Sequence, residues 1–453
     1  MKNRRIFSVF LLVVLILTTV LPPSVSAVEE MDVAAKAALL IDPTTEEILY
    51  EENIHERLYP ASLTKVMTAL LVLEAVENGT LTLDQELAAS KYAIESIPYD
   101  ASTANIKVGE TLSVETLLYC ILVVSANEAC NILGEAIAGS VDAFVEMMNE
   151  KAAALGCEDT HFVTPNGLHD DNHYTTAWDL YLITKAALEY DLFMEVADTR
   201  YFTIPATYYN KERTYYTTNF LLSPYRAAGY VYKYAHGVKT GFTSKAGNCL
   251  ISTAEKDDRQ LLGVILGAEK VPLESGGTQV QSFSEMTRLF TWGFDNFTRQ
   301  EIISSDELVY ELSVTLSEKD FVVLHPAYDM ERLLPNDINV EDLQRKFTLV
   351  GESVEAPIAA GTELGSVEIS YGDTVYATIP LLANTNVDAS RLLVFRRDVL
   401  EFVQRRDVQL IAIAVVAALI LLIIIIKLTG RRRNRYGRRN GYAHNRAYRG
   451  RRR

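Results

Sequence analysis

Ser62 and Lys65 are the residues of this sequence whose types and spacing most clearly suggest chemistry. The string Ser62-Leu63-Thr64-Lys65 follows Pro60 and opens a segment with helical apolar periodicity. A spacing of three places the serine and the lysine on one face of a helical turn. A lysine whose pKa is lowered by burial can take the proton of a serine hydroxyl, which is otherwise a weak nucleophile. The helix N-terminus adds backbone N–H groups that stabilise an oxyanion.

Two further groups of polar residues lie downstream of this pair. Ser125 and Asn127 follow an apolar run, on a predicted loop between helices, and offer a hydroxyl and a carboxamide. Lys239-Thr240-Gly241 precedes a strand-like segment. A cation, a hydroxyl and a glycine on an edge strand suit recognition of a peptide's terminal carboxylate. An isolated S-x-x-K string arises by chance in a chain of this length, and then marks a helix cap and a surface lysine, so the order of all three groups carries the prediction.

The elements that must position these groups alternate between short strands and helices from about residue 35 to residue 297. The segments Ala38–Asp42 and Ile48–Glu51 predict a hairpin, since a polar turn joins them. Apolar periodicity predicts helical structure over Leu63–Glu77 and over Val114–Ala138. The strand-like residues Asn248–Ile251 follow the Lys239 group. This stretch predicts one catalytic domain.

After Ser304 the pattern changes to period-two alternation with glycine turn signals. Leu308, Tyr310 and Leu312 show this alternation, and it returns around Val367 and Ile369. Residues 305–395 are therefore predicted to form a small all-β domain. Residues 396–407 are predicted to be a charged connector with helical character.

The two ends of the chain carry targeting patterns. Residues 1–27 are typical of an export signal, with three basic residues, an apolar run from Ile6 to Leu21 and small residues that end at Ala27. Signal cleavage is expected after Ala27. An uncleaved N-terminal anchor is the alternative. Val408–Ile426 is an unbroken apolar run that predicts a transmembrane helix over 408–428. The tail 429–453 holds eleven arginines and no acid, which predicts that it stays cytoplasmic and that the body of the chain faces outward.

Charge and cysteine content exclude several classes of function. The formal net charge is −16 although both ends of the chain are basic, so the body is strongly acidic and nucleic-acid binding is not expected. The arginine tail is expected to orient the anchor or to contact anionic lipid. The four cysteines are too few and too scattered for a zinc knuckle or a disulfide scaffold. Buried free thiols are expected, and Cys120 with Cys130 is the closest pair for a bridge.

A metal site and a cofactor are not expected. His169 and His173 are four residues apart beside two aspartates, a spacing that suits a metal if the segment is helical. The neighbouring Asn166-Gly167 favours a loop, and the sequence contains no H-E-x-x-H string. The catalytic chemistry is therefore expected from the side chains of the three groups themselves.

The longer strings around these groups resemble those of a known family. They are Ala61–Thr68, Val124–Ala129, Thr164–His169 and Gly237–Leu250. They are similar to the low-molecular-mass D-alanyl-D-alanine carboxypeptidases, the serine peptidases that include penicillin-binding protein 5. The resemblance covers residues 35–297 strongly and the β domain loosely. It departs at the C-terminal end, where that group often has an amphipathic helix on the membrane and this chain has a predicted span.

The resemblance implies an α+β fold, with a largely antiparallel sheet flanked by helices and the site between the sheet and a helical subdomain. It also implies the catalytic roles. Ser62 would attack the D-Ala-D-Ala carbonyl while Lys65 accepts its proton, and Ser125 would relay a proton to the leaving amine. The backbone N–H groups of Ser62 and Phe242 would hold the oxyanion, and water would then release the acyl group.

The resemblance implies the substrate contacts as well. Asn127 would hold the substrate amide, Lys239 and Thr240 would hold the terminal carboxylate, and Gly241 would allow close backbone approach. The expected partners are peptidoglycan stem peptides that end in D-Ala-D-Ala, with β-lactam antibiotics as covalent inhibitors and the membrane as anchor.

Three alternatives share these residues. A serine β-lactamase uses the same triplet but usually adds a glutamate that activates water, and no convincing E-x-x-L-N string lies between Ser125 and Lys239. A D,D-endopeptidase would act on cross-links with the same site. A catalytically inactive scaffold that binds the cell wall through its β domain is the non-enzymatic alternative, although such a protein has no reason to keep the complete triplet.

Overall fold

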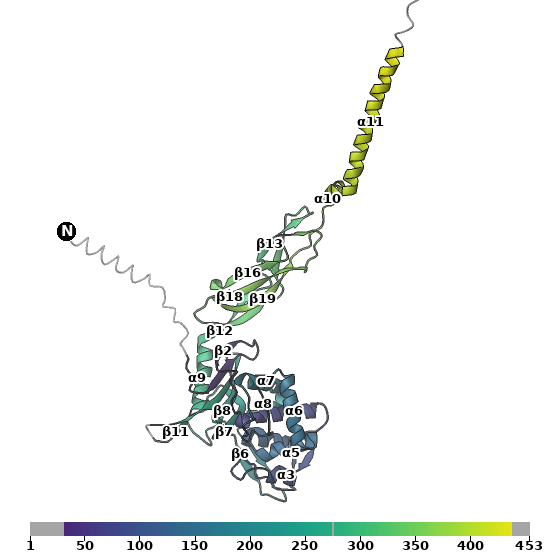
Figure 1. Ribbon diagram of the computed structural model, residues 1–453. Coiled ribbons are helices and arrows are strands. Elements are labelled where there is room, and N and C mark those ends of the chain that lie inside the picture. The colour runs from purple at the N-terminus through teal and green to yellow at the C-terminus, as the bar shows by residue number, and fades with distance from the viewer. Residues whose placement is uncertain (1–30, 274–275, 437–453) are drawn as a thin grey trace, which may run out of the picture. The chain divides into compact units, whose positions relative to one another are not determined.

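The computed structural model describes residues 31–273 and 276–436, with side chains as far as residue 429. The predicted export signal, residues 1–27, lies outside the described residues, as does the tail after residue 436. The chain divides into two compact units (Figure 1). The first runs to Gln300 and includes the later segment Glu331–Asp342, and the second comprises Glu301–Met330 and the chain from Leu343 onward.

A five-stranded antiparallel sheet forms the centre of the first unit. Its order is β2-β1-β9-β8-β7, so β7 is an edge strand. The strands are β1 (Ala37–Ile41), β2 (Ile48–Glu52), β7 (Ala235–Thr243), β8 (Gly247–Lys256) and β9 (Arg259–Ala268). The predicted hairpin of the first two strands is confirmed, with Leu39 opposite Glu51.

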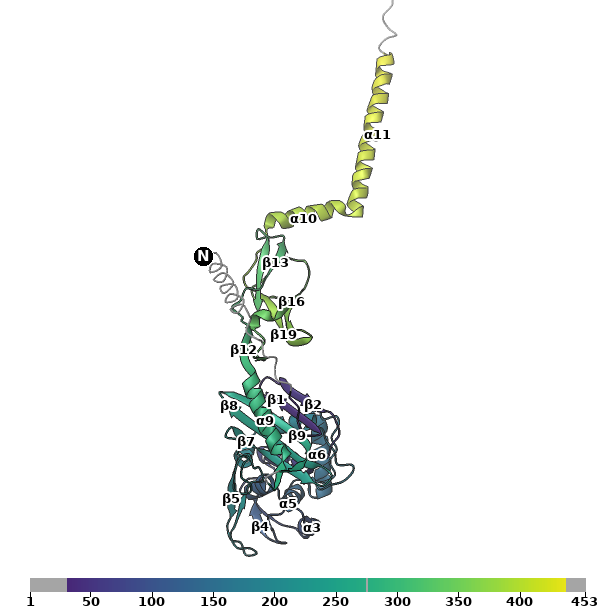
Figure 2. The same ribbon diagram turned by 90° about the vertical axis from the view of Figure 1, so that its left-hand side faces the viewer.

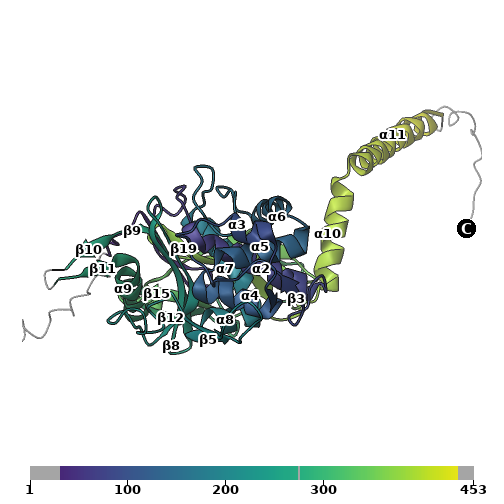
Figure 3. The same cartoon turned by 90° about the horizontal axis from the view of Figure 1, so that it is seen from below.

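Helices cover both faces of this sheet because its central strands are apolar on both sides. Along β1, Leu39 and Ile41 belong to one buried cluster while Ala38 and Leu40 belong to another, as the period of two requires. The helix α9 (Gln281–Asn296) packs on the Leu40 side (Figure 2). Figure 3 shows the other helices across the strands from α9.

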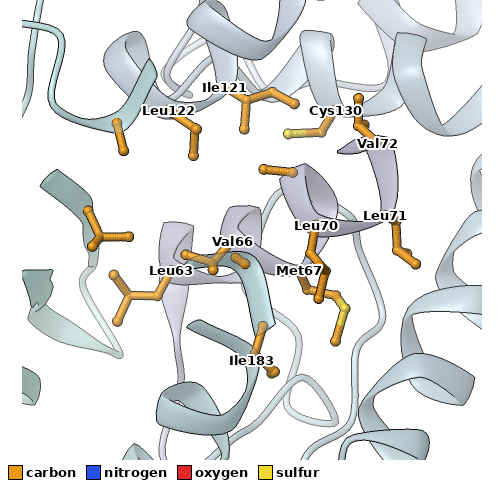
Figure 4. Packing of buried hydrophobic residues seen from close by; sticks show 14 of the residues in the cluster. Leu63, Val66, Met67, Leu70, Leu71, Val72, Ile121, Leu122, Cys130 and Ile183 are labelled. Carbon is orange, nitrogen blue, oxygen red and sulfur yellow. The ribbon is translucent and has the colours of Figure 1, made fainter. Parts of the chain in front are cut away.

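The helical group carries the first two sets of predicted site residues. It comprises α2 (Lys65–Glu77), α3 (Lys91–Glu95), α4 (Val114–Tyr119), α5 (Asn127–Ala138), α6 (Val141–Ala154), α7 (Ala177–Leu188) and α8 (Asp191–Ala197), with the short helices η1 (Ala61–Thr64) and η2 (Cys120–Val124). The predicted helix after Ser62 is confirmed, and the stretch from residue 114 to residue 138 is interrupted where the loop was predicted. Figure 4 shows Val66, Met67 and Leu70 of α2 beside Ile121, Cys130 and Ile183.

Three small strand pairs complete the first unit. They are β3 (Glu86–Ala88) with β4 (Thr111–Ser113), β5 (Tyr201–Ile204) with β6 (Arg213–Tyr216), and β10 (Lys270–Pro272) with β11 (Thr278–Val280). The segment Glu331–Asp342 belongs to this unit, although residues 305–395 were predicted to form the β domain. The Leu333 N–H donates to the Glu47 carboxylate at 2.8 Å, which ties the segment to the loop after β1.

The second unit contains a six-stranded sheet in the order β16-β18-β19-β14-β13-β17. The strands are β13 (Tyr310–Thr315), β14 (Phe321–Pro326), β16 (Gln344–Leu349), β17 (Ser353–Glu355), β18 (Glu363–Tyr371) and β19 (Thr374–Ala383). Figure 1 shows β16, β18 and β19 side by side. The predicted all-β character is confirmed, since alternate residues such as Val367 and Ile369 are buried. The segment that returns to the first unit carries a short helix, η3 (Val340–Asp342), and most of the strand β15 (Met330–Pro335), which pairs with β12 (Phe297–Ile303).

Two helices end the described chain. The helix α10 (Arg391–Gln404) covers most of the predicted connector, and α11 (Arg406–Tyr436) follows it. Residues Arg406–Thr429 of α11 have a mean hydropathy of 3.3 and are long and apolar enough to cross a membrane. This agrees with the predicted span at the level of length and composition.

Candidate active site

Ser62 lies on a tight turn that two neighbouring segments hold from opposite sides. Ala61, just before it, has a φ of 48°, and η1 leads directly into α2. A Cβ placed on Gly167 would come within 1.8 Å of the Ala61 carbonyl oxygen, and one on Gly241 would lie 2.9 Å from that of Pro60. Only a residue without a side chain therefore fits at either position, and the serine has little freedom to move.

The Lys65 amine is completely buried and points at the serine hydroxyl. Its Nζ lies 2.8 Å from Ser62 Oγ, 2.7 Å from Asn127 Oδ1 and 2.6 Å from the Asn166 carbonyl oxygen. Burial lowers the pKa of Lys65 to about 8. A neutral amine has two N–H donors, which the two carbonyl oxygens accept. Its lone pair then faces Ser62 Oγ, which is the arrangement a general base needs.

The break between η2 and α5 places Ser125 at the cavity and Asn127 against the Lys65 amine. Ser125 ends η2 in the left-handed conformation, with a φ of 68°, and α5 begins at Asn127. The Asn127 N–H donates to the Ser102 carbonyl at 2.9 Å, which fixes the start of α5. Both residues are buried, and both line the same cavity as Ser62.

The Lys239 group lies on β7, at the edge of the sheet. Thr240, Gly241 and Phe242 line the cavity, and the Thr240 hydroxyl donates to the Thr218 hydroxyl at 2.7 Å. Gly241 packs against the turn, where its Cβ would lie 3.2 Å from the Ser62 nitrogen. The backbones that carry the Ser62 and Phe242 N–H groups therefore adjoin, which an oxyanion site between them requires.

Lys239 itself is buried behind the strand rather than exposed in the cavity. Its Nζ donates to the Thr240 carbonyl at 2.9 Å, and its side chain is 1% exposed. Burial, followed by the nearby charge of Lys65, holds the pKa of Lys239 well below its ordinary value. The charge of Lys65 thus disfavours the charged form of Lys239.

The cavity that these residues line has a volume of about 620 Å³. Six of the eight predicted site residues line it, and the other two, Lys65 and Lys239, bond to lining residues, although the eight come from three distant parts of the chain. The cavity also includes residues from the segments 98–102, 166–168, 218–220, 243–249 and 280–283. No group of three or more metal-ligating side chains occurs within the described part of the chain.

Asn166 and His173 are functional positions whose roles the sequence did not reveal. Asn166 acts through its backbone carbonyl, which accepts from Lys65. His173, weighed above as a metal ligand, is buried in a loop. Its Nδ1 accepts from the Val163 and Thr164 N–H groups at 3.0 and 3.3 Å, so its Nε2 carries the proton and donates to Thr64 Oγ1 at 2.8 Å. The ring thus ties the loop before Asn166 to the turn of Ser62.

The four cysteines are free thiols, and three of them are buried. Cys120 and Cys130 lie among the apolar residues of the helical group. Burial raises the pKa of the Cys130 thiol to about 12, so it stays protonated beside Lys65. These thiols act as small apolar core residues.

Comparison with known proteins identifies the family. A family model described as D-alanyl-D-alanine carboxypeptidase matches residues 24–270, more than half of the chain. The chain belongs to this family. A second model, described as the C-terminal domain of penicillin-binding protein 5, matches residues 297–389.

Relatives of the family match along most of the chain. The D-alanyl-D-alanine carboxypeptidase DacF of Bacillus subtilis is 28% identical over 398 residues, which cover 86% of this chain and 97% of the relative. DacD of Salmonella typhimurium is 30% identical over 358 residues, with 78% and 86% of the two chains covered. Among solved structures, penicillin-binding protein 5 of Haemophilus influenzae has a TM-score of 0.63 and 27% identity, and it covers 80% of this chain and 100% of its own.

The burial of His173 leads to a test of the site's stability. Burial lowers the pKa of His173 to about 4, against an ordinary value of 6.5, with smaller effects from His161, Asp170, His169 and Lys65. The unfolded chain therefore binds a proton between these pH values and the folded chain does not. We expect the free energy of unfolding to fall by about 3 kcal/mol as the pH is lowered from about 6.5 to about 4.

Urea unfolding followed by tryptophan fluorescence measures this dependence, since both tryptophans of the chain, Trp178 and Trp292, lie in the first unit. The variant His173→Gln retains polar groups but does not titrate. It should lack this part of the pH dependence. If the free energy of unfolding changed equally with pH in the wild type and the variant, the assignment of a buried neutral His173 imidazole would be contradicted.

Proposed function

We propose that this protein is a serine carboxypeptidase that removes the terminal D-alanine from peptidoglycan stem peptides through an acyl-enzyme on Ser62. The observation that carries the proposal is the Lys65 amine, held with its lone pair toward Ser62 Oγ by two carbonyl acceptors. Family membership supports the substrate class, because the relatives are named D-alanyl-D-alanine carboxypeptidases.

The proposed reaction has two steps. Ser62 Oγ attacks the carbonyl of the penultimate D-alanine as Lys65 takes its proton, and the N–H groups of Ser62 and Phe242 stabilise the oxyanion. The C–N bond then breaks, and Ser125 relays the proton taken up by Lys65 to the amine of the terminal D-alanine. Water subsequently attacks the ester and releases the shortened peptide.

The proposed substrate contacts follow the line of β7. The Asn127 amide group faces the substrate amide, since its carbonyl oxygen is used by Lys65. The terminal carboxylate lies at Thr240, and the buried Lys239 supports this part of β7 from behind through its hydrogen bond to the Thr240 carbonyl. Gly241 allows the substrate backbone to approach the edge strand.

The residues that line the cavity support a β-lactamase less well than a carboxypeptidase. No glutamate lines it among residues 31–273 and 276–436, whereas rapid release of a penicilloyl ester usually depends on one. We infer that β-lactams acylate Ser62 and leave slowly, which makes them inhibitors of this protein.

The first test measures the proposed reaction. The purified protein should release D-alanine from a pentapeptide that ends in D-Ala-D-Ala, and Ser62→Ala should abolish the release because no acyl-enzyme can form. Labelled penicillin should give a covalent adduct that peptide mass mapping locates on Ser62. An adduct on one of the cysteines, or its persistence in Ser62→Ala, would refute the assignment of the nucleophile.

The second test separates the two buried lysines. Lys65→Ala removes the base and should lower the acylation rate by about 10²–10⁴-fold. Lys239→Ala removes a buried hydrogen bond to the Thr240 carbonyl, which costs about 1–3 kcal/mol, and leaves the base in place, so it should do less damage. In the wild type, acylation should accelerate as the pH rises through about 8, where Lys65 loses its proton.

Lys65→Arg is the matched control, since arginine keeps the positive charge but cannot act as a base at neutral pH. It should be as inactive as Lys65→Ala. Greater damage from Lys239→Ala than from Lys65→Ala would reverse the two roles.

We further propose that residues 28 to about 407 lie outside the cytoplasmic membrane and that the arginine tail lies inside. The apolar residues of α11 support a span, and eleven arginines beyond it support the orientation. Protease added to cells stripped of their wall should digest the first unit and spare an epitope placed after Arg453. A chain truncated before Val408 should appear in the medium as active enzyme, and firm membrane retention of that truncated chain would exclude a single anchor.

A further inference from the structure

Glu128 is a buried carboxylate beside the catalytic site that the proposed reaction does not use. It follows Asn127 in the first turn of α5 and is 2% exposed. Its Oε1 accepts from the Thr103 hydroxyl at 2.6 Å and from the Ala104 N–H at 2.8 Å. Its Oε2 is buried and has no hydrogen-bond partner within the described part of the chain. An unpaired buried oxygen costs stability, so its presence calls for an explanation.

The hydrogen bonds of Glu128 join α5 to the wall of the catalytic cavity. Residues from the segment 98–102 line the cavity, and the Ser102 carbonyl accepts from the Asn127 N–H at 2.9 Å. Glu128 holds the two residues that follow in the same segment. Because Asn127 Oδ1 orients the Lys65 amine at 2.7 Å, a displacement of this segment would also displace an acceptor of the base.

The charge of Glu128 also acts on the Lys65 amine. Burial lowers the pKa of Lys65 to about 8, and smaller effects from Cys130 and Glu128 oppose this lowering. A buried charge is screened less by solvent and salt than an exposed one, so its field acts more strongly on its neighbours. The Glu128 carboxylate therefore makes the amine easier to protonate.

The other titratable groups around Lys65 are not anions. Burial raises the pKa of Cys130, two residues after Glu128 on α5, to about 12, so this thiol stays neutral. Burial lowers the pKa of Lys239 on β7 and that of His173 in its loop, and the charge of Lys65 adds to both effects. Glu128 is thus the member of this group whose charge favours a proton on the amine.

The groups that face Glu128 itself do not neutralise it. Cys120 of η2 and Tyr215 of β6 both have raised pKa values, first because of burial and in part because of the Glu128 charge. Arg213, on the same strand as Tyr215, is already paired with the buried Glu110 at 2.7 Å. No ion pair to Glu128 occurs among residues 31–273 and 276–429, so its charge stays uncompensated by a direct partner.

An uncompensated negative charge at this place suits the proposed reaction, on which this inference rests. A general base works best when the pKa of its conjugate acid lies near the working pH. Burial alone would lower the pKa of Lys65 further, and the amine would then take the Ser62 proton less readily. Glu128 offsets part of the effect of burial.

We propose that Glu128 is a positioning residue for the reaction at Ser62. Its Oε1 holds residues 103–104 against the start of α5 and so fixes Asn127, and its buried charge keeps the Lys65 amine basic enough to take the serine proton. Glu128 is not among the described residues that line the cavity, so it acts through these neighbours and not on the substrate. Its loss should change kcat and the pH dependence more than KM.

The test follows acylation of the full-length protein by labelled penicillin in detergent micelles at a series of pH values, with D-alanine release measured in parallel. Glu128→Gln keeps an acceptor oxygen but loses the charge. The midpoint of its pH profile should lie below the wild-type midpoint, expected at about 8, and its highest acylation rate should be lower. Glu128→Asp keeps the charge, so its midpoint should stay close to that of the wild type.

Thr103→Val tests the positioning separately from the charge. Valine has nearly the shape of threonine but cannot donate to the Glu128 carboxylate. We expect kcat for D-alanine release to fall by about tenfold while KM and the midpoint of the pH profile change little. An unchanged kcat in Thr103→Val would overturn the positioning role, even if Glu128→Gln failed to fold.

Glu135→Gln is the matched control, because Glu135 lies on the same helix and also accepts from a hydroxyl, that of Ser90 at 3.0 Å. It should leave both kcat and the midpoint unchanged. An unchanged midpoint in a folded Glu128→Gln, or an equal change in Glu135→Gln, would overturn this inference and leave the carboxypeptidase intact. A wild type that is acylated but releases no D-alanine would instead overturn the proposed function.

Discussion

The catalytic unit depends on an amine that is buried without a carboxylate partner. Placing the Lys65 ammonium in an apolar core is costly, and this cost lowers the pKa of Lys65 to about 8. The two acceptors that orient the amine come from Asn127 and from the Asn166 backbone, so α5 and the loop before Gly167 must both be in place. His173 fastens that loop to the same turn. The site is therefore a property of the assembled unit and not of a single motif.

Much of this arrangement could be predicted from the sequence. The three groups around Ser62, Ser125 and Lys239 are read from side chains with distinctive chemistry in a fixed order, and the first hairpin and the alternation of the β domain follow simple periods. The turn of Ser62 could be predicted to lie at the start of a helix, because a segment with helical apolar periodicity follows the motif. The break before Asn127 could be expected because polar residues follow an apolar run.

Other features depend on contacts between distant residues, which local patterns do not contain. The carbonyl of Asn166 acts through its backbone, so its side-chain type gives no signal. A loop was expected around His169 and His173, but nothing local to the sequence shows that it directs His173 into the core to meet Thr64, 109 residues earlier in the chain. The segment Glu331–Asp342 packs with the first unit through Glu47, a contact that no periodicity records.

The crowding around the nucleophile has a consequence for inhibitor design. Gly167 and Gly241 leave no room for the Ala61–Ser62 backbone to shift, so the turn should keep the same conformation in the free protein and in its acylated form. A ligand can then gain little affinity from induced fit at the serine, and compounds can be built against a rigid receptor. Selectivity among relatives would come from substituents that grow away from the reactive carbonyl, toward surfaces whose side chains differ from one family member to another.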